Sequence, residues 1–225
     1  MRNSVGYPHL GVKIGATHAG ITVGEDGATH QCLEDIALMR TIPGMTIINP
    51  ADAVEAYAAV EAVINFEGPV YMRFGRFATP VFNVGGDYKF EIGKGIEIIS
   101  GSDVTFVATG LMVTMAMEAA EMLEKEGISA RVINIHTIKP IDRDIIIKAA
   151  KETGAIVTAE EHNIIGGLGS AVSEVVSEEC PVPVIRVGVK DTFGRSGTVP
   201  ALLEAYGLTP KDLCENAKKA VALKK

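Results

Sequence analysis

The sequence predicts an α/β protein made of two consecutive three-layer units with mostly parallel sheets. Short runs rich in β-branched residues alternate with longer stretches of helical periodicity, which is typical of parallel α/β folds. Between two such alternations, residues 79–95 show weak periodicity and contain proline and glycine, as a surface linker does. The 225 residues, 47% of them hydrophobic, suffice for a substantial core. We therefore expect one unit at residues 1–78, a linker at 79–95 and a second unit at 96–225.

The first unit is expected to contain three strands and two helices. In chain order they are a strand at Val12–Ala16, a helix at Gln31–Arg40, a strand at Thr46–Ile48, a helix at Ala51–Phe66 and a strand at Val70–Phe74. Asn49 is expected to cap the second helix, with Pro50 at the first helical position, where its missing N–H costs nothing. Three strands are few for a doubly wound sheet, so this unit either borrows structure from a partner or is incomplete.

The second unit continues the alternation. Its expected elements are strands at Val104–Ala108, Arg131–Ile135, Ile156–Ala159 and Val184–Val187, and helices at Leu111–Glu126, Asp142–Thr153 and Leu168–Glu179, followed by two carboxy-terminal helices. Gly127 and Gly154 are expected to end helices in the left-handed conformation, and Thr209-Pro210 to open the last helix.

Composition excludes several classes of partner. The chain has 21 basic and 28 acidic residues and no cluster of lysine and arginine, so neither nucleic acid nor an anionic membrane is an expected partner. The three cysteines are widely spaced and form no CxxC pair, which favours a reducing compartment and three small buried thiols. No apolar run is long enough to span a bilayer and no signal-peptide pattern opens the chain, so we expect a cytoplasmic protein.

The loop from Thr17 to Gln31 has the highest density of functional residue types. It carries His18, Glu25, Asp26 and His30 among glycines, and it follows a predicted strand, where open α/β folds place their ligands. The spacing matches no known metal motif, so we expect no metal ligands here. Imidazoles and a carboxylate suit proton transfer and binding of a polyol. The alternative is a polar loop whose histidines only cap backbone groups.

This loop also carries a family resemblance. The string VGEDGATHQ, with His18 upstream and LEDIALMRTIPGMTIINPADAVEA downstream, resembles the pyrimidine-binding domain of transketolases. The block after the linker resembles their carboxy-terminal domain. The Thr17-His18 pair is more similar to transketolase than to deoxyxylulose-phosphate synthase, and Ala19-Gly20 is more similar to the split form, whose two halves are separate polypeptides.

The resemblance implies a reaction and site residues. The reaction is transfer of a two-carbon ketol unit between sugar phosphates, on thiamine diphosphate held by Mg²⁺. It implies that His30 contacts the cofactor and acts in proton transfer, that Asp26 binds a substrate hydroxyl, and that His18 lies farther out in the substrate channel. Arg73 is expected to bind the sugar phosphate, because a guanidinium pairs with phosphate oxygens bidentately. Without the family, a surface salt bridge is the expected role of Arg73.

The resemblance also implies a partner. The family's cofactor-activating glutamate, its aromatic pocket and its GDG metal motif are not visible in this sequence. We therefore expect thiamine diphosphate and Mg²⁺ to come mainly from an amino-terminal transketolase subunit, in a homo-oligomer or heterotetramer, and the chain alone to be inactive. Two alternatives are half of another thiamine-diphosphate enzyme, such as deoxyxylulose-phosphate synthase or a 2-oxoacid dehydrogenase beta subunit, and a non-catalytic scaffold.

A second glycine-rich motif, Gly166–Ser170, precedes a predicted helix. It is similar to a dinucleotide-binding fingerprint, but the preceding loop is long and Glu178 and Glu179 come too soon to bind a ribose. In the resembled family this turn follows the Glu160-Glu161-His162 string and is a structural loop. We expect no nucleotide there.

Overall fold

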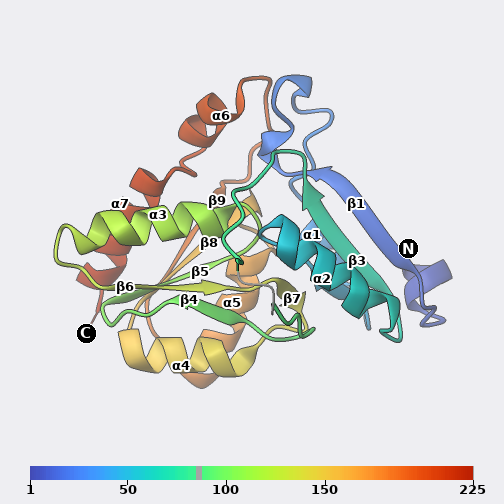
Figure 1. Cartoon of the computed structure of the whole chain (residues 1–225), viewed down its shortest axis with the longest axis horizontal. Helices are drawn as coiled ribbons and strands as arrows, with labels where there is room; N and C mark the ends of the chain where they lie inside the picture. The colour runs from blue at the N-terminus through green and yellow to red at the C-terminus, as the bar shows by residue number, and fades with distance from the viewer. Residues whose placement is uncertain (85–87, 225) are drawn as a thin grey trace.

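The computed structural model describes residues 1–84 and 88–224 and contains two sheets (Figure 1). The first has the strand order β1 (Lys13–Ala19), β3 (Val70–Gly75), β2 (Thr46–Ile48), β7 (Thr137–Lys139). The second has the order β4 (Ile96–Ile99), β6 (Ala130–Asn134), β5 (Val104–Ala108), β8 (Ile156–Asn163), β9 (Val184–Val189). Pairing is parallel except for β2 with β7 and β4 with β6, so the predicted fold class of mostly parallel sheets is confirmed.

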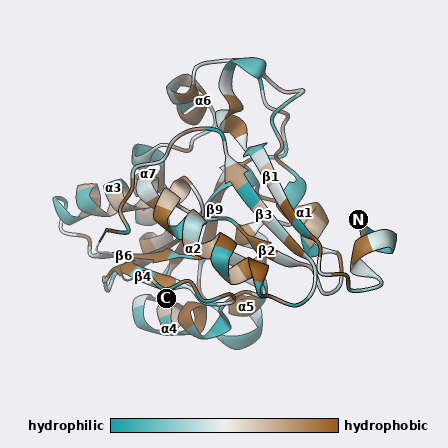
Figure 2. Cartoon of the chain, turned by 45° about the vertical axis from the view of Figure 1, so that its right-hand side comes forward, coloured by the Kyte–Doolittle hydropathy of each residue, from teal (hydrophilic) through white to brown (hydrophobic). Residues whose placement is uncertain are grey.

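Helices cover the sheets. They are the short η1 (Arg2–Gly6) and η2 (Ile21–Asp26), then α1 (Asp35–Arg40), α2 (Ala53–Ile64), α3 (Met112–Glu124), α4 (Arg143–Thr153), α5 (Leu168–Glu179), α6 (Val199–Ala205) and α7 (Pro210–Ala222). In the second unit, α3 and α7 lie on one face of the sheet and α4 and α5 on the other (Figure 1). Both hydrophobic and hydrophilic residues occur along α4 and α5 (Figure 2). In the described residues, no helix combines the length and apolar character needed to cross a membrane.

The start of α2 differs from the sequence expectation. Its cap is Asp52, whose Oδ1 accepts a hydrogen bond from the Glu55 amide at 2.9 Å. Asp52 has the extended backbone that a cap needs, and a carboxylate is favoured at a helix amino terminus. The prediction that Asn49 caps this helix is therefore wrong.

The helix expected from Gln31 begins only at Asp35. Residues 31 and 32 instead run beside β1, where Ala19 and Cys32 form an isolated bridge and the Gly20 amide donates to the Cys32 carbonyl at 2.9 Å. The expectation of three buried thiols is also wrong in part, because Cys32 is exposed whereas Cys214 is buried. The chain thus stays extended between the polar loop and α1.

Two strands were not predicted, and one of them joins the two units. Strand β7 follows β6 in the chain, yet Ile47 pairs with Lys139 and Ile48 with Thr137 in the first sheet. The first sheet therefore gains its fourth strand from residues beyond the expected linker. The boundaries 1–78, 79–95 and 96–225 stay a prediction, and residues 85–87 of that linker lie outside the described part of the chain.

The hydrophobic core is continuous across the two units. One cluster packs Ile21 and Leu33 from the first unit with Phe106 and Val187 from the second. A second cluster packs Ile47 of the first sheet with buried residues of the second sheet. Burial of this apolar surface holds the polar loop rigidly against the second sheet.

Candidate functional site

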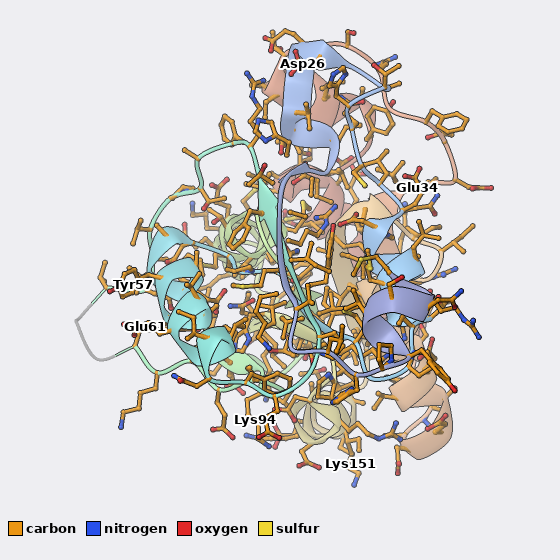
Figure 3. The ribbon with its side chains drawn as sticks, turned by 90° about the vertical axis from the view of Figure 1, so that its right-hand side faces the viewer. Asp26, Glu34, Tyr57, Glu61, Lys94 and Lys151 are labelled. Carbon is orange, nitrogen blue, oxygen red and sulfur yellow. The ribbon has the colours of Figure 1, made fainter. Side chains whose placement is uncertain are left out.

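The predicted catalytic loop lies on the surface at the carboxyl end of β1. His18, Asp26 and His30 are all exposed, and Asp26 lies at the end of the molecule opposite Lys151 (Figure 3). Each imidazole has one local contact, Nδ1 of His18 with the Thr17 hydroxyl at 3.0 Å and Nδ1 of His30 with the Thr29 hydroxyl at 3.0 Å. His18, near the end of β1, and Asp26 and His30, in the segment after it, are therefore presented outward and remain available to a ligand or partner.

The loop follows its path because glycines allow close contact with the second unit. Gly20 and Gly27 have φ of +86° and +77°, which side chains rarely adopt. A Cβ atom at Gly20 would collide with the Glu161 carboxylate, and one at Gly27 would collide with the Ser196 hydroxyl. The glycines in this loop thus serve packing between the units.

Two buried polar side chains hold the loop in place. Oε1 of Glu161 accepts hydrogen bonds from the backbone amide and the hydroxyl of Thr22, both at 2.6 Å. Nε2 of Gln31 donates to the carbonyls of Ile21 at 3.1 Å and Arg195 at 3.0 Å. Sequence reasoning missed both anchors, because Glu161 lies 139 residues from Thr22, and Arg195 lies 164 residues from Gln31, along the chain.

Arg73 lies in the interior. Its side chain is 3% exposed, so the expectation of a surface salt bridge is wrong. Nε donates to Oδ2 of Asp35 at 2.8 Å, and Nη2 donates to the carbonyls of Glu161 at 3.0 Å and Cys32 at 3.3 Å. Burial would raise the pKa of Asp35, but the Arg73 guanidinium and the Tyr71 hydroxyl lower it below its ordinary value. This ion pair joins β3, α1 and β8, and the predicted phosphate role of Arg73 stays a prediction.

Arg76 is the exposed arginine that sequence reasoning missed. Its side chain is 46% exposed, its Nη1 donates to the Val23 carbonyl at 2.8 Å, and it lies 3.8 Å from Oδ2 of Asp26. Because β3 ends at Gly75, Arg76 emerges beside the polar loop instead of entering the core. The signal in the sequence is the second arginine of Arg73-Phe74-Gly75-Arg76, placed after the strand.

The helix that follows the second glycine motif has a carboxyl group of the protein at its amino terminus. The carboxylate of Glu160 is fully buried and accepts hydrogen bonds from the amides of Leu168 at 2.7 Å and Gly169 at 2.8 Å. Burial raises the pKa of Glu160 to about 7, and burial lowers the pKa of the neighbouring His162 to about 4. The amino terminus of α5 is therefore satisfied by a side chain of the protein, in the place where a nucleotide phosphate would bind.

The described residues of the polar loop do not enclose a ligand by themselves. In residues 1–84 and 88–224, no group of three His, Cys, Asp or Glu side chains could hold a metal ion. His18, Asp26 and His30 lie open on the surface, so the described residues do not enclose a cofactor around them.

Comparison with known proteins identifies the family of both units. Residues 1–81 match the transketolase pyrimidine binding domain, and residues 93–213 match the transketolase C-terminal domain. A protein of Methanocaldococcus jannaschii named as a transketolase C-terminal section is 46% identical over 96% of this chain and 68% of its own length. The 6-deoxy-6-sulfo-D-fructose transketolase subunit SqwH of Clostridium sp. strain MSTE9 is 43% identical over 98% of this chain and 68% of its own length.

Solved structures agree with this match. A split-gene transketolase, described as an inactive β4 tetramer, is 51% identical with a TM-score of 0.91 over 100% of this chain and 71% of that chain. A Pichia stipitis transketolase solved with sedoheptulose 7-phosphate is 26% identical with a TM-score of 0.78, over 95% of this chain and 30% of that chain. Both domains match in sequence and in fold, and the chain belongs to the transketolase family, whose domains depend on thiamine diphosphate.

Proposed function

We propose that this chain is the carboxy-terminal subunit of a split transketolase, which transfers a two-carbon ketol unit between sugar phosphates. The observation that carries the proposal is the polar loop, which presents His18, Asp26 and His30 outward while Glu161 and Gln31 hold it from beneath. A rigid loop with exposed polar tips suits a site that a second subunit completes. Its rigidity keeps the reacting groups in place before substrate binds.

Each exposed side chain has a proposed role. His30 contacts the cofactor and the reacting carbons, and its imidazole moves a proton to or from a substrate hydroxyl. Asp26 accepts a hydrogen bond from a hydroxyl of the sugar. His18 lies farther out along the bound substrate. Thiamine diphosphate, when bound, supplies the stabilised carbanion that carries the ketol unit, and the amino-terminal subunit supplies most of its contacts and those of Mg²⁺.

Arg76 is a further proposed ligand of the substrate's terminal anion, and the phosphate role of Arg73 stays a prediction. Arg76 is exposed beside Asp26, whereas three groups of the protein already occupy Nε and Nη2 of Arg73. Names of related proteins support an anionic substrate, since they include a sulfofructose, apulose 4-phosphate and 1-deoxy-D-xylulose 5-phosphate. Sulfonate and phosphate both present oxygens that pair with a guanidinium.

A partner subunit is the second part of the proposal. Two relatives are named as subunits, and the split-gene structure is described as an inactive tetramer of one chain. We accordingly propose a heteromeric enzyme with an amino-terminal transketolase subunit, and no turnover by this chain alone.

A deoxyxylulose-phosphate synthase half is the second candidate. The synthase of Heliobacterium modesticaldum is 41% identical over 91% of this chain, although the match spans 32% of that protein. The test is to mix the purified chain with its amino-terminal partner and to compare a ketose phosphate with pyruvate as donor. Ketol transfer from the ketose phosphate, only with the partner, is the expected result. Turnover of pyruvate alone, or equal turnover without the partner, would overturn the proposal.

A further inference from the structure

A cleft of about 530 Å³ lies on the carboxy-terminal unit, between the loop that follows β9 and the turn that joins α6 to α7. Its volume is within the range of roughly 300–1,000 Å³ that small-molecule sites have. None of the residues proposed above to contact the substrate borders it. We call it the aromatic cleft, and the residues that line it include Lys190, Thr192, Phe193, Arg195, Glu204 and Tyr206.

Two aromatic side chains border the aromatic cleft. The Phe193 ring is 83% exposed, and Tyr206 is half-buried. A single exposed aromatic residue is common on a protein surface, but two that border one cleft form a place where a planar ring can stack. Stacking on aromatic side chains is one way in which proteins bind nucleobases.

The backbone that carries Phe193 is held in place by side chains from outside the loop. The Tyr206 hydroxyl donates a hydrogen bond to the Phe193 carbonyl at 2.9 Å, and Nε2 of Gln31 donates to the Arg195 carbonyl at 3.0 Å. The helix after the loop, α6, packs against η2 of the polar loop (Figure 1). The Phe193 ring is therefore exposed on a positioned backbone, and little conformational entropy is lost when a ligand covers it.

Two cationic side chains border the same cleft. Lys190 and Arg195 are exposed, and neither forms an ion pair with another residue in the described part of the chain. The guanidinium carbon of Arg195 lies 5.8 Å from the centre of the Tyr206 ring, within the range of a cation–π contact. An ammonium and a guanidinium without a carboxylate partner suit the oxygens of a phosphate group.

Carboxylates are fewer than cations in the lining of the aromatic cleft. Glu204 lines it, whereas Asp191, next to Lys190 in the chain, lies 3.5 Å from Nδ2 of Asn163. The lining therefore carries two cations and one carboxylate, although the chain as a whole is acidic. A carboxylate can accept hydrogen bonds from ribose hydroxyls, as it does in dinucleotide-binding folds. Rings, cations and one carboxylate together match the parts of a nucleotide.

We propose that the aromatic cleft binds a nucleoside monophosphate. The base stacks on Phe193 and Tyr206. The phosphate pairs with Lys190 and Arg195, and Glu204 accepts hydrogen bonds from the ribose. This site is separate from the glycine motif before α5, and it does not depend on the ketol-transfer reaction. A sugar phosphate without a base would leave both rings uncovered, so the experiment compares the ligand with its parts.

The test is a titration of the ¹⁵N-labelled full chain with AMP, followed by the amide signals of Thr192 and Gly207, which both line the cleft. Adenosine and ribose 5-phosphate are titrated separately as the two parts of the ligand. We expect saturable shifts with AMP, and a Kd at least about tenfold higher for each part alone. Equal affinity for ribose 5-phosphate and AMP would overturn the inference, because the rings would then add nothing.

Two variants of exposed residues separate the base from the phosphate. Phe193→Ala should raise the Kd for both AMP and adenosine by about tenfold or more, because it removes a stacking ring. Lys190→Gln should raise the Kd for AMP and leave the Kd for adenosine unchanged, because it removes a partner of the phosphate. Tyr57→Ala and Lys151→Gln are the matched controls, since these exposed residues lie on α2 and α4 (Figure 3).

The result is also independent of the proposed substrate site. Arg76→Gln should leave the response to AMP unchanged. Absence of saturable shifts with AMP, or parental affinity for AMP in Phe193→Ala, would overturn the inference and leave the proposed function intact. Contact with another subunit is the other common use of exposed aromatic residues. Protection of residues 190–197 from hydrogen exchange by the amino-terminal subunit, without any response to AMP, would identify that use and also overturn the ligand site.

Discussion

Glu161, on the buried strand β8, accepts two hydrogen bonds from Thr22, one from its amide and one from its hydroxyl, each at 2.6 Å. Thr22 belongs to the loop that presents Asp26 and His30, whereas Glu161 belongs to the second unit. The polar loop is consequently joined to the carboxy-terminal unit by a buried contact. The carboxy-terminal unit thus contributes to the proposed activity by holding the loop in place.

Thr22→Val tests this contact with little change of side-chain shape. The variant keeps the amide hydrogen bond and removes the hydroxyl donor, so Glu161 loses one of its buried partners. We expect a loss of about 1–2 kcal/mol in the free energy of unfolding, measured with urea. Thr192→Val, at an exposed threonine, is the control and should change stability by less than about 0.5 kcal/mol. Equal stability of the two variants would contradict the role of this contact.

Substitutions of Arg73, within β3, and of Arg76, just after it, should differ in their effect on stability. Arg73→Gln leaves the Asp35 carboxylate buried without its cation, which costs about 3–5 kcal/mol. Arg76→Gln removes an exposed charge and should change the free energy of unfolding by less than about 0.5 kcal/mol. Thermal or urea unfolding of the two purified variants checks this order. Similar losses in both would show that Arg73 is not the structural arginine.

Substitution of Arg76 should also change the kinetics of the assembled enzyme. In the enzyme assembled with its partner, Arg76→Gln should raise KM for phosphorylated donors by about tenfold or more, because it removes a charge-assisted pair. A donor without phosphate should be used as well by the variant as by the parent. Equal effects on both kinds of donor would contradict the anion-binding role of Arg76.

Glu160 and His162 should give opposite dependences of stability on pH. The folded pKa of Glu160 is about 7 against an ordinary 4.5, so its contribution to stability is full below pH 4.5 and is lost as pH rises to 7. The folded pKa of His162 is about 4 against an ordinary 6.5, so its contribution is full above pH 6.5 and is lost as pH falls to 4. Between pH 4.5 and 6.5 the two slopes oppose each other.

Single variants separate the two dependences of the free energy of unfolding on pH. Glu160→Gln leaves His162, so the free energy of unfolding should fall by on the order of 3 kcal/mol between pH 6.5 and 4.5. His162→Asn leaves Glu160, so the same acidification should raise stability. The change with pH within each variant is compared, because both substitutions also alter hydrogen bonds. Identical slopes in the two variants would contradict this assignment.

The sequence predicted the polar loop better than the contacts that hold it in place. The strand before the loop and the glycines within it can be read from local pattern, and they predicted the irregular segment that carries Asp26 and His30. His18 was expected in that segment, but β1 runs to Ala19 and includes it. Arg73 could not be assigned in this way, because burial depends on Asp35 and Glu161, which only the fold brings to it. Long-range contacts of this kind leave no periodic signal.

The sequence can also offer two acceptable starts for one helix, and local pattern alone does not decide between them. Asn49-Pro50 and Asp52 are both acceptable helix starts, and the carboxylate at Asp52 was chosen by contacts with Phe82 and Asn83 from the expected linker. Strand β7 was missed because its partner, β2, precedes it by 90 residues or so in the chain. Tertiary pairing decided both features.

The measurement that tests the central claim most directly is the turnover number of the assembled two-subunit enzyme with His30→Ala. The account predicts ketol transfer by the parent pair, and a loss of about 10²–10⁴-fold in kcat in the variant, because a proton-transferring imidazole is removed. His9→Ala is the matched control, since His9 lies beside Gly44 and Gly68, before the amino ends of β2 and β3, and should retain parental kcat. Parental kcat in His30→Ala, or full ketol transfer by this chain without its partner, would contradict the account.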